Sequence, residues 1–328
     1  LGPLIQGQDG ALYGVTSNGG AHGGGGTVFR ITLEGVYDVL HSFGGSPTDG
    51  IVPMGGLVQG SDGDFYGVTA SGGANHCLQI PQDGSNCGTV FKVTPAGDTT
   101  ILHSFGSSPG DGITPTASLT QANDGNFYGT TVSGGANDCG AAPNSCGTVF
   151  RVTPEGITTT LHSFGTGFMP GLLPMDGIAP QSALAQGPDG ALYGTTASGG
   201  NGRCGFEYGC GTVFRITLNG ELTILHAFAV DSVEDGTGPS AYLILGKDGN
   251  LYGTTGSGGA YPDPMTGTVF RMSLSGLKTT LFSFGPTGNQ PTNPVAGVIE
   301  GSDGAFYGVT AYSTTAGGTG TVFRLVMQ

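Results

Sequence analysis

Apolar and polar residues alternate in four short runs, and this set of runs repeats along the chain. The clearest copy spans residues 57–105 and reads LVQGSDGDFYGVTASGG, an insert, and then GTVFKVTPAGDTTILHSF. Short alternating runs bounded by Gly- and Asp-rich turns predict β-strands rather than helices. In this copy we expect strands at residues 56–59, 64–69, 88–94 and 99–105.

One tyrosine marks each repeat and sets its length. It follows the second strand's apolar start and recurs at Tyr13, Tyr66, Tyr128, Tyr193, Tyr252 and Tyr307. A period somewhat above fifty residues with four strands per unit is typical of a propeller blade, because β-helix coils are much shorter. The sequence therefore predicts one all-β domain over 1–328, a six-bladed β-propeller of four-stranded antiparallel blades. The expected blades are 1–46, 47–108, 109–167, 168–230, 231–287 and 288–328.

The last blade is expected to lack its own outer strand. Fourth strands of the Leu-His-Ser-Phe type occur at 40–43, 102–105, 161–164, 225–228 and, with Phe in place of His, 281–284. The third strand of the last blade, 319–325, would then leave an unpaired edge with one Arg and no Pro. Residues preceding Leu1 could supply the missing strand, or a neighbouring molecule could, through self-association. We favour the first source, because the chain starts in the middle of the repeat pattern.

Two kinds of connection separate the strands. The first and second strands are joined by short Asp-Gly-like turns, whose aspartates we interpret as turn formers and not as a calcium ring. The connections after the second and fourth strands vary in length and are rich in Gly and Pro. They emerge on one side of each blade, so the sequence predicts a loop-rich face that carries binding residues. The turn aspartates are Asp9, Asp62, Asp124, Asp189, Asp248 and Asp303.

The chain is acidic, with a formal net charge of −14 and only nine basic residues. Six of these follow GTVF directly, and we interpret them as architectural residues with a partner acid or carbonyl that also repeats. No basic patch is left for a phosphate backbone or an anionic membrane, which excludes nucleic acid and membrane surfaces as partners. No apolar run approaches the ~20 residues that span a bilayer, so no membrane insertion is expected. The six are Arg30, Lys92, Arg151, Arg215, Arg271 and Arg324.

The cysteines fall as one pair in each of three consecutive inserts, and the second cysteine always precedes Gly-Thr-Val-Phe. Their spacing does not fit a zinc site, which would need paired CxxC spacings or nearby histidines. We predict three local disulfides, which persist outside the cytosol, and therefore a secreted or cell-surface protein. The predicted pairs are Cys77–Cys87, Cys139–Cys146 and Cys204–Cys210.

The motifs YGTT, SGG, GTVF(R/K)(V/I)T and LHSF, in this order, resemble the GloVer tandem repeat of bacterial surface and exported proteins. The resemblance covers essentially the whole chain. It implies an exported, cell-surface or anchored protein, and it carries over no active site, because the family lacks an established set of catalytic residues. The order of the strands is also similar to that of NHL-type propeller blades.

Two sets of polar residues repeat and are candidates for sites. Histidines of the fourth strand, at His41, His103, His162 and His226, are expected to pack and hydrogen-bond within each blade, because Phe282 replaces the fifth. The residues that end the first strand are expected to line a central channel and solvate it, and a structural cation in the channel or loops is an open alternative. No cofactor is predicted. The channel residues are Gln6, Gln59, Gln121, Gln186 and Glu300.

Residues that depart from the repeat pattern are the candidates for ligand binding. Carbohydrate sites are built from aromatic rings beside carboxylates. The simpler interpretation of each candidate residue is an exposed loop side chain with no binding role. Glu207 and Asp235 could form a carboxylate pair for glycoside hydrolysis, and the chain has no nucleophile elbow, HExxH or P-loop. The candidates are Phe168, Arg203, Phe206, Glu207, Tyr208, Asp235, Tyr261 and Tyr312.

These patterns predict an exported bacterial binding or structural protein that engages a glycan or a protein at the cell surface through its loop-rich face. The alternative is an extracellular hydrolase or lyase that acts on a polysaccharide with acidic residues of the same face. Catalytic residues and a metal site cannot be named from the sequence.

Overall fold

A computed structural model describes residues 2–75, 77, 87–139, 146–167, 174–200, 209–229, 235–239, 241–261, 266–285, 291–313 and 319–327. These residues form β-strands and turns, and no helix occurs among them. The chain divides into two compact units, Leu1–Phe164 and Gly165–Gln328, which are described separately.

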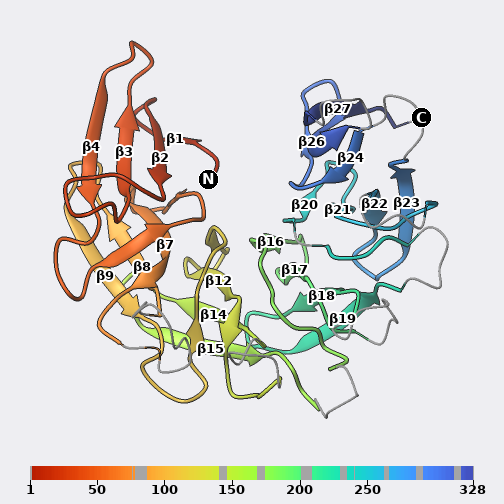
Figure 1. Ribbon diagram of the computed structural model, residues 1–328, viewed down its shortest axis with the longest axis horizontal. Helices are drawn as coiled ribbons and strands as arrows, with labels where there is room; N and C mark the ends of the chain where they lie inside the picture. The colour runs from red at the N-terminus through yellow and green to blue at the C-terminus, as the bar shows by residue number, and fades with distance from the viewer. Residues whose placement is uncertain are drawn as a thin grey trace. The chain divides into compact units, whose positions relative to one another are not determined.

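The first unit contains three repeats, each built on an antiparallel sheet (Figure 1). The first sheet consists of β1 (Ile5–Gln6), β2 (Leu12–Thr16), β3 (Thr27–Ile31) and β4 (Tyr37–Ser42). The second consists of β5 (Gly50–Pro53), β6 (Val58–Gln59), β7 (Phe65–Gly72), β8 (Thr89–Val93) and β9 (Thr99–Ser104). The third consists of β11 (Thr120–Gln121), β12 (Phe127–Thr131), β14 (Thr148–Val152) and β15 (Thr158–Ser163), beside a small sheet of β10 (Gly112–Ile113) and β13 (Ser133–Gly134).

The second unit repeats this plan. The fourth sheet consists of β16 (Ala185–Gln186), β17 (Leu192–Thr196), β18 (Thr212–Ile216) and β19 (Leu222–Ala227). The fifth consists of β20 (Ile244–Leu245), β21 (Leu251–Thr255), β22 (Thr268–Met272) and β23 (Lys278–Ser283). The sixth consists of β24 (Pro291–Pro294), β25 (Ile299–Glu300), β26 (Phe306–Ser313) and β27 (Thr321–Leu325). The predicted all-β fold with several four-stranded antiparallel sheets is confirmed, although the second sheet has five strands because β5 and β6 both pair with β7. Among the described residues β27 pairs with β26 and with no fourth strand.

The core of each unit lies between consecutive sheets. The repeat tyrosine of one sheet stacks on an aromatic residue of the next, with ring centroids 3.9 Å apart for Tyr13 and Phe65 and also for Tyr66 and Phe127. The phenylalanine that follows β4, Phe43, meets Phe91 of β8 edge-on at 4.9 Å. These side chains are almost fully buried, and burying one such ring contributes roughly 2–3 kcal/mol. The alternating pattern of the sequence therefore produces a sheet-on-sheet core.

The turn aspartates hold the start of each sheet together, as predicted. One carboxylate oxygen accepts the backbone N–H two residues later, as Asp9 does from Ala11 at 3.1 Å. The other oxygen accepts the hydroxyl of the repeat tyrosine in all six repeats, at 2.6–3.0 Å. In four repeats the basic residue after GTVF donates to the same aspartate, which confirms its architectural role. The four are Arg30, Lys92, Arg215 and Arg324.

Two of the predicted disulfides are confirmed, Cys77–Cys87 and Cys139–Cys146. The third predicted pair includes Cys204, which lies outside the described residues. Since disulfides persist in oxidising compartments, the two pairs indicate an oxidising, extracytosolic environment. Among the described residues there is no helix long and apolar enough to span a membrane.

Candidate functional site

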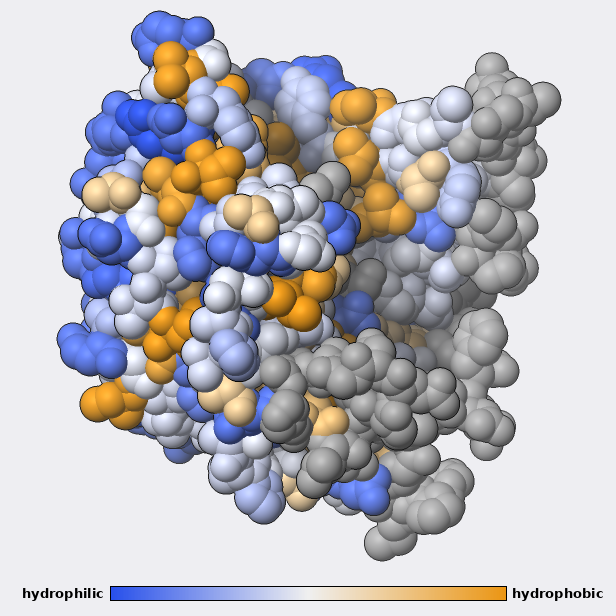
Figure 2. Space-filling view, turned by 60° about the vertical axis from the view of Figure 1, so that its left-hand side comes forward, coloured by the Kyte–Doolittle hydropathy of each residue, from blue (hydrophilic) through white to orange (hydrophobic). Residues whose placement is uncertain are grey.

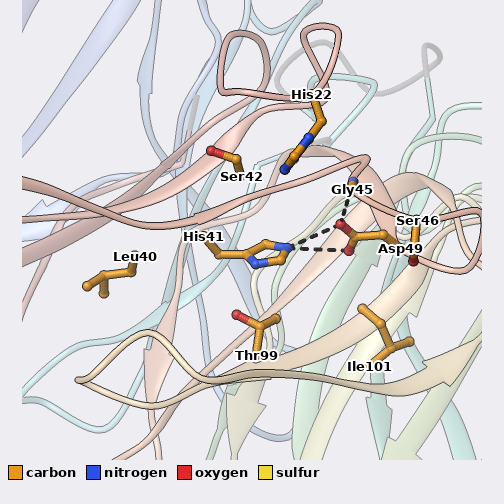
Figure 3. A pocket seen from close by; sticks show the side chains of 9 residues that line it. All are labelled: His22, Leu40, His41, Ser42, Gly45, Ser46, Asp49, Thr99 and Ile101. Carbon is orange, nitrogen blue, oxygen red and sulfur yellow. Dashed lines mark hydrogen bonds and ion pairs between the residues drawn. The ribbon is translucent and has the colours of Figure 1, made fainter.

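A pocket of about 420 Å³ lies between β4 of the first repeat and β9 of the second. Because the strands are antiparallel, the loops after second and fourth strands reach the same edge of each sheet, and the pocket collects side chains from both kinds of loop. It contains no tryptophan or other large aromatic ring. Its lining residues are shown in Figure 3 and are His22, Leu40, His41, Ser42, Gly45, Ser46, Asp49, Thr99 and Ile101.

The centre of the pocket is an imidazole held by a buried carboxylate. His41 Nε2 lies 3.3 Å from Asp49 Oδ2 and 3.4 Å from Oδ1. The same carboxylate accepts backbone N–H groups from Gly45 at 3.1 Å and Gly50 at 2.8 Å. Burial alone would raise the pKa of Asp49, but the hydrogen bonds from His41, Gly45 and Gly50 outweigh burial and lower it. Asp49 is therefore a charged group that positions His41 and the loop after β4.

The same histidine–aspartate pair recurs in other repeats, which shows that it is a structural feature of the repeat. His103 Nε2 lies 3.1 Å from Asp111, and His226 Nε2 lies 2.8 Å from Asp235. The histidine rings also meet the phenylalanine two residues later edge-on, as His41 meets Phe43 at 4.6 Å. In the fifth repeat Phe282 makes this edge contact with Phe284 at 5.0 Å. The predicted packing and hydrogen-bonding role of these histidines is confirmed.

His22 is what distinguishes this pocket from the other repeats. It comes from the loop between β2 and β3, is exposed, and directs its ring toward the space beside Gly45 (Figure 3). A Cβ atom placed on Gly45 would lie 3.3 Å from His22 Nε2 and 3.8 Å from Asp49 Oδ2, so glycine keeps this space open. In the second repeat, Gly106 corresponds to Gly44 and faces the Cys77–Cys87 disulfide, whereas Gly44 faces His22.

Ser42 also differs from its counterparts. In the second, third and fifth repeats the corresponding serine hydroxyl accepts a backbone N–H from the loop after the second strand, as Ser104 does from Ala74 at 3.1 Å. Among the described residues Ser42 makes no such bond, so its hydroxyl is available to a ligand. With His22, His41 and the hydroxyls of Ser46 and Thr99, it gives the pocket several polar groups between the apolar walls of Leu40 and Ile101.

The pocket fits a neutral polar ligand better than a metal. In the described part of the chain, no three His, Cys, Asp or Glu side chains lie together so that they could hold a metal ion. Both oxygens of Asp49 already accept hydrogen bonds, one ring nitrogen of His41 is bonded to Asp49, and the hydroxyls of Ser46 and Thr99 bond to Thr48 and Gly97. In the part of the chain that the structure describes, this leaves the His22 imidazole and the Ser42 hydroxyl as the polar groups open to a ligand. Such groups can donate to and accept from the hydroxyl groups of a small polar molecule.

The predicted ligand-binding residues are only partly described. Phe168, Arg203, Phe206, Glu207 and Tyr208 lie outside the described residues. Tyr261 and Tyr312 are partly exposed, at 38% and 45%.

Asp235 is buried and bonds to His226 and Lys278, each at 2.8 Å. It is therefore the repeat counterpart of Asp49 rather than a departure from the pattern. A ligand-binding role for these residues stays a prediction.

The predicted channel residues hold turns together. The side-chain amides of Gln6, Gln59, Gln121 and Gln186 donate to the carbonyl four residues later at 2.9–3.0 Å. Three members also accept a backbone N–H of the preceding repeat through their side-chain oxygen. Gln59 accepts that of Gln8 at 2.9 Å, and Gln121 accepts that of Ser61 at 3.0 Å. Glu300 accepts the N–H of Lys247 at 2.9 Å. Their role in a channel stays a prediction.

Sequence reasoning missed His22 and the pocket. The available signal was that His22 lies outside the LHSF motif, in a loop of small residues. The contacts that make the pocket come from two repeats, and a pattern within one repeat cannot show them.

Comparison with solved structures supports a propeller-like fold. The GH93 α-L-arabinofuranosidase of Fusarium graminearum, in complex with arabinobiose, is similar with a TM-score of 0.57 and 13% identity, over 98% of this chain and 91% of that one. The extracellular domain of a hybrid two-component system from B. thetaiotaomicron is similar with a TM-score of 0.52 and 12% identity, over 93% and 32%. At these identities the similarity concerns the fold alone.

Comparison at the sequence level identifies the family. No curated protein matches the chain in sequence. The family model described as the Gloeobacter/Verrucomicrobia repeat matches residues 1–229 and 203–328, which together cover the whole chain. The repeated tyrosine–aspartate turns, GTVF strands and LHSF strands that carry the fold are thus those of a known repeat, and the chain belongs to the Gloeobacter/Verrucomicrobia repeat family.

Proposed function

We propose that this protein is an exported surface protein that binds a glycan, and that the pocket of His22, His41 and Ser42 is a binding site for one of its sugar units. The observation that carries the proposal is that the first repeat differs from the others at this pocket. His22 reaches the pocket from the loop after the second strand, and the Ser42 hydroxyl does not bond to that loop as Ser104 does in the second repeat. Imidazole and hydroxyl groups suit the donors and acceptors of a sugar, and Leu40 and Ile101 offer apolar contact to its C–H groups.

The surface and charge of the molecule support a neutral ligand outside the cytosol. The face drawn in Figure 2 carries hydrophobic residues as separate patches among polar ones, whereas a membrane or obligate protein interface needs a larger continuous apolar area. The net charge of −14 disfavours anionic polymers. The two disulfides support export.

The finer architecture is part of the proposal. We infer that the six repeats are the six blades of a single β-propeller. The repeated four-stranded sheets, the family match over the whole chain and the similarity to the arabinofuranosidase support this inference.

A second candidate is an extracellular enzyme that acts on a polysaccharide. The observation that favours it is the His41–Asp49 pair in an open pocket, since an imidazole held by a carboxylate can serve as a general base. Its recurrence at His103 and His226 favours a structural origin, so we rank binding first.

A glycan array followed by calorimetry tests the proposal. The purified chain should bind a defined set of glycans, and His22→Ala should weaken the best ligand at least tenfold without changing the melting temperature. Gln8→Ala, an exposed change on the turn at the opposite edge of the first sheet, should leave affinity unchanged. Binding that survives His22→Ala, or no binding on the array, would refute the proposal. Turnover of the bound glycan would favour the enzyme.

A further inference from the structure

Lys278 is a lysine buried between the fourth and fifth repeats, both of which belong to the second unit. It is the first residue of β23, and its side chain is 8% exposed. The ammonium lies 5.5 Å from the ring centre of Phe228 and 5.7 Å from that of Phe270, and both rings are buried. Lysine is almost never buried without a charged partner. The residues at the same register position of the other four fourth strands are Tyr37, Thr99, Thr158 and Leu222.

The charged partner is the carboxylate of Asp235, which lies in the loop after β19 of the fourth repeat. Lys278 Nζ lies 2.8 Å from Asp235 Oδ1, and the aspartate side chain is 7% exposed. The ammonium also donates to Thr280 Oγ1 at 3.0 Å. Taking both charges out of water is costly even when they are paired. A reaction that removes both charges at this place therefore lowers the free energy of the buried groups.

Two further donors hold the same carboxylate, one on each oxygen. His226 Nε2 lies 2.8 Å from Oδ1, which is the oxygen that contacts the ammonium. The N–H of Ala229 donates to Oδ2 at 3.0 Å. A backbone donor on one oxygen stabilises negative charge that develops there, and an imidazole on the other can supply a proton to a leaving oxygen. An amine, a carboxyl group, a proton donor and an oxyanion donor thus meet at one buried point.

We propose that Lys278 and Asp235 condense to a side-chain amide, an isopeptide bond that joins the fifth repeat covalently to the fourth. The ammonium passes one proton to Oδ1, and the resulting amine bonds to Cγ of Asp235. Negative charge collects on Oδ2, where the N–H of Ala229 stabilises it. His226 donates a proton to Oδ1, the Cγ–Oδ1 bond breaks, and water leaves. The imidazole recovers its proton from the nitrogen, so the reaction consumes no other reagent.

The fold supplies the conditions for this reaction. Two groups held in contact react as if they were present at very high concentration, and the rings of Phe228 and Phe270 exclude the water that would hydrolyse the product. The first repeat offers a comparison, because His41 and Asp49 share their pocket with Thr99, which stands at the register position of Lys278. A hydroxyl group there takes the place of the amine.

Mass spectrometry of the reduced and denatured chain tests the bond. The unmodified chain should be lighter than its sequence by the mass of one water molecule in nearly all molecules. Trypsin should release a branched peptide in which residues 216–247 and 272–324 are joined through Asp235 and Lys278, because an amidated lysine has lost the charge that trypsin recognises. An unmodified chain of full mass would overturn the proposal.

The variant Lys278→Thr distinguishes the bond from another loss of water. A cyclic imide at Asp235–Gly236 would remove the same mass, but it would persist in this variant and would give no branched peptide. Threonine stands at this position in the second and third repeats, so the variant should fold. It should have the full mass of its sequence. Loss of water in Lys278→Thr, or a branch at other residues, would contradict the proposal.

The variant His226→Phe tests the proton donor. Phenylalanine stands at this position in the fifth repeat, as Phe282, so the ring should fit. Because this ring carries no exchangeable proton, freshly purified protein should contain unreacted chain that loses water at least about tenfold more slowly. The same exchange in the second repeat, His103→Phe, should leave the bond complete. A bond that forms as fast in His226→Phe as in the unmodified chain would refute the role of His226.

Discussion

At the scale of single residues, the structure depends on one turn carboxylate in each repeat, which in four of the six repeats accepts hydrogen bonds from three neighbouring residues. In the fourth repeat Asp189 accepts the hydroxyl of buried Tyr193 at 3.0 Å and the guanidinium of Arg215 at 2.7 Å, and it also accepts the N–H of Ala191. Burial would raise the pKa of Asp189, but the bonds from Arg215 and Tyr193 outweigh burial and lower it. The carboxylate is therefore the central member of this network, and the arginine is a partly exposed addition.

Two alanine substitutions separate these contributions. Asp189→Ala should destabilise the protein by about 1–3 kcal/mol, because it leaves the buried Tyr193 hydroxyl and a turn N–H without their acceptor. Arg215→Ala should cost only about 0–1 kcal/mol, because partly exposed ion pairs contribute little. Urea unfolding of both variants at neutral pH measures the difference. An equal or larger loss for Arg215→Ala would show that the arginine is the central member.

A second residue-scale feature is a strained position that links consecutive repeats. Val52, Thr114, Ala179 and Asn293 have φ between 55° and 58°, each directly before a proline, and Gly238 takes this position with φ of 64°. The N–H of Val52 donates to the carbonyl of Gly25 at 2.8 Å. A left-handed conformation costs a β-branched residue about 1–2 kcal/mol.

The strain predicts opposite effects for two exchanges at equivalent positions. Val52→Gly should be neutral or should stabilise the protein by up to about 1 kcal/mol, since relief of strain exceeds the entropic cost of glycine. Gly238→Val, the reverse exchange in the fifth repeat, should destabilise by about 1–2 kcal/mol. Both follow from chemical denaturation curves. A marked loss of stability in Val52→Gly would mean that the valine side chain contributes more by packing than it costs in strain.

At the scale of elements, the second and third strands of each repeat fit together because a glycine faces an aromatic ring. A Cβ atom on Gly67 of β7 would lie 2.5 Å from Cζ of Phe91 on β8, and the same contact recurs at Gly129, Gly194 and Gly253. This explains why glycine follows the repeat tyrosine in the middle of a strand, where it is otherwise unfavourable.

The fit predicts a compensating pair of substitutions. Gly67→Ala should destabilise the protein by about 1–3 kcal/mol, because the methyl group overlaps the ring of Phe91. In the Phe91→Leu background the same change should cost at least about 1 kcal/mol less, since leucine leaves the contact open. A double-mutant cycle measures this coupling, and additive effects would contradict it.

The repeated elements could be predicted from sequence, because each follows from residues within one repeat. The turn aspartates, the basic residues after GTVF and the disulfide pairs Cys77–Cys87 and Cys139–Cys146 were predicted for this reason. The acceptor of each histidine was not predicted. Asp49 reaches His41 only because the loop after β4 folds back, and loop conformation has no periodic signal.

At the scale of the whole molecule, comparing the six repeats distinguishes structural residues from candidate functional ones. Six copies of one plan show what the fold requires, and departures from that plan show where a ligand has room to bind. The first repeat departs at His22 and Ser42. The candidate pocket was not predictable, because its walls come from two repeats that meet only after folding.

The measurement that tests the glycan pocket most directly is the affinity of Gly45→Ala for the glycan selected on the array. This change keeps every polar group of the pocket and adds one methyl group, 3.3 Å from His22 Nε2. Calorimetry should show at least a tenfold loss of affinity with an unchanged melting temperature, because the methyl group occupies the space that the sugar needs. An affinity equal to that of the unmodified protein would contradict the assignment of this pocket.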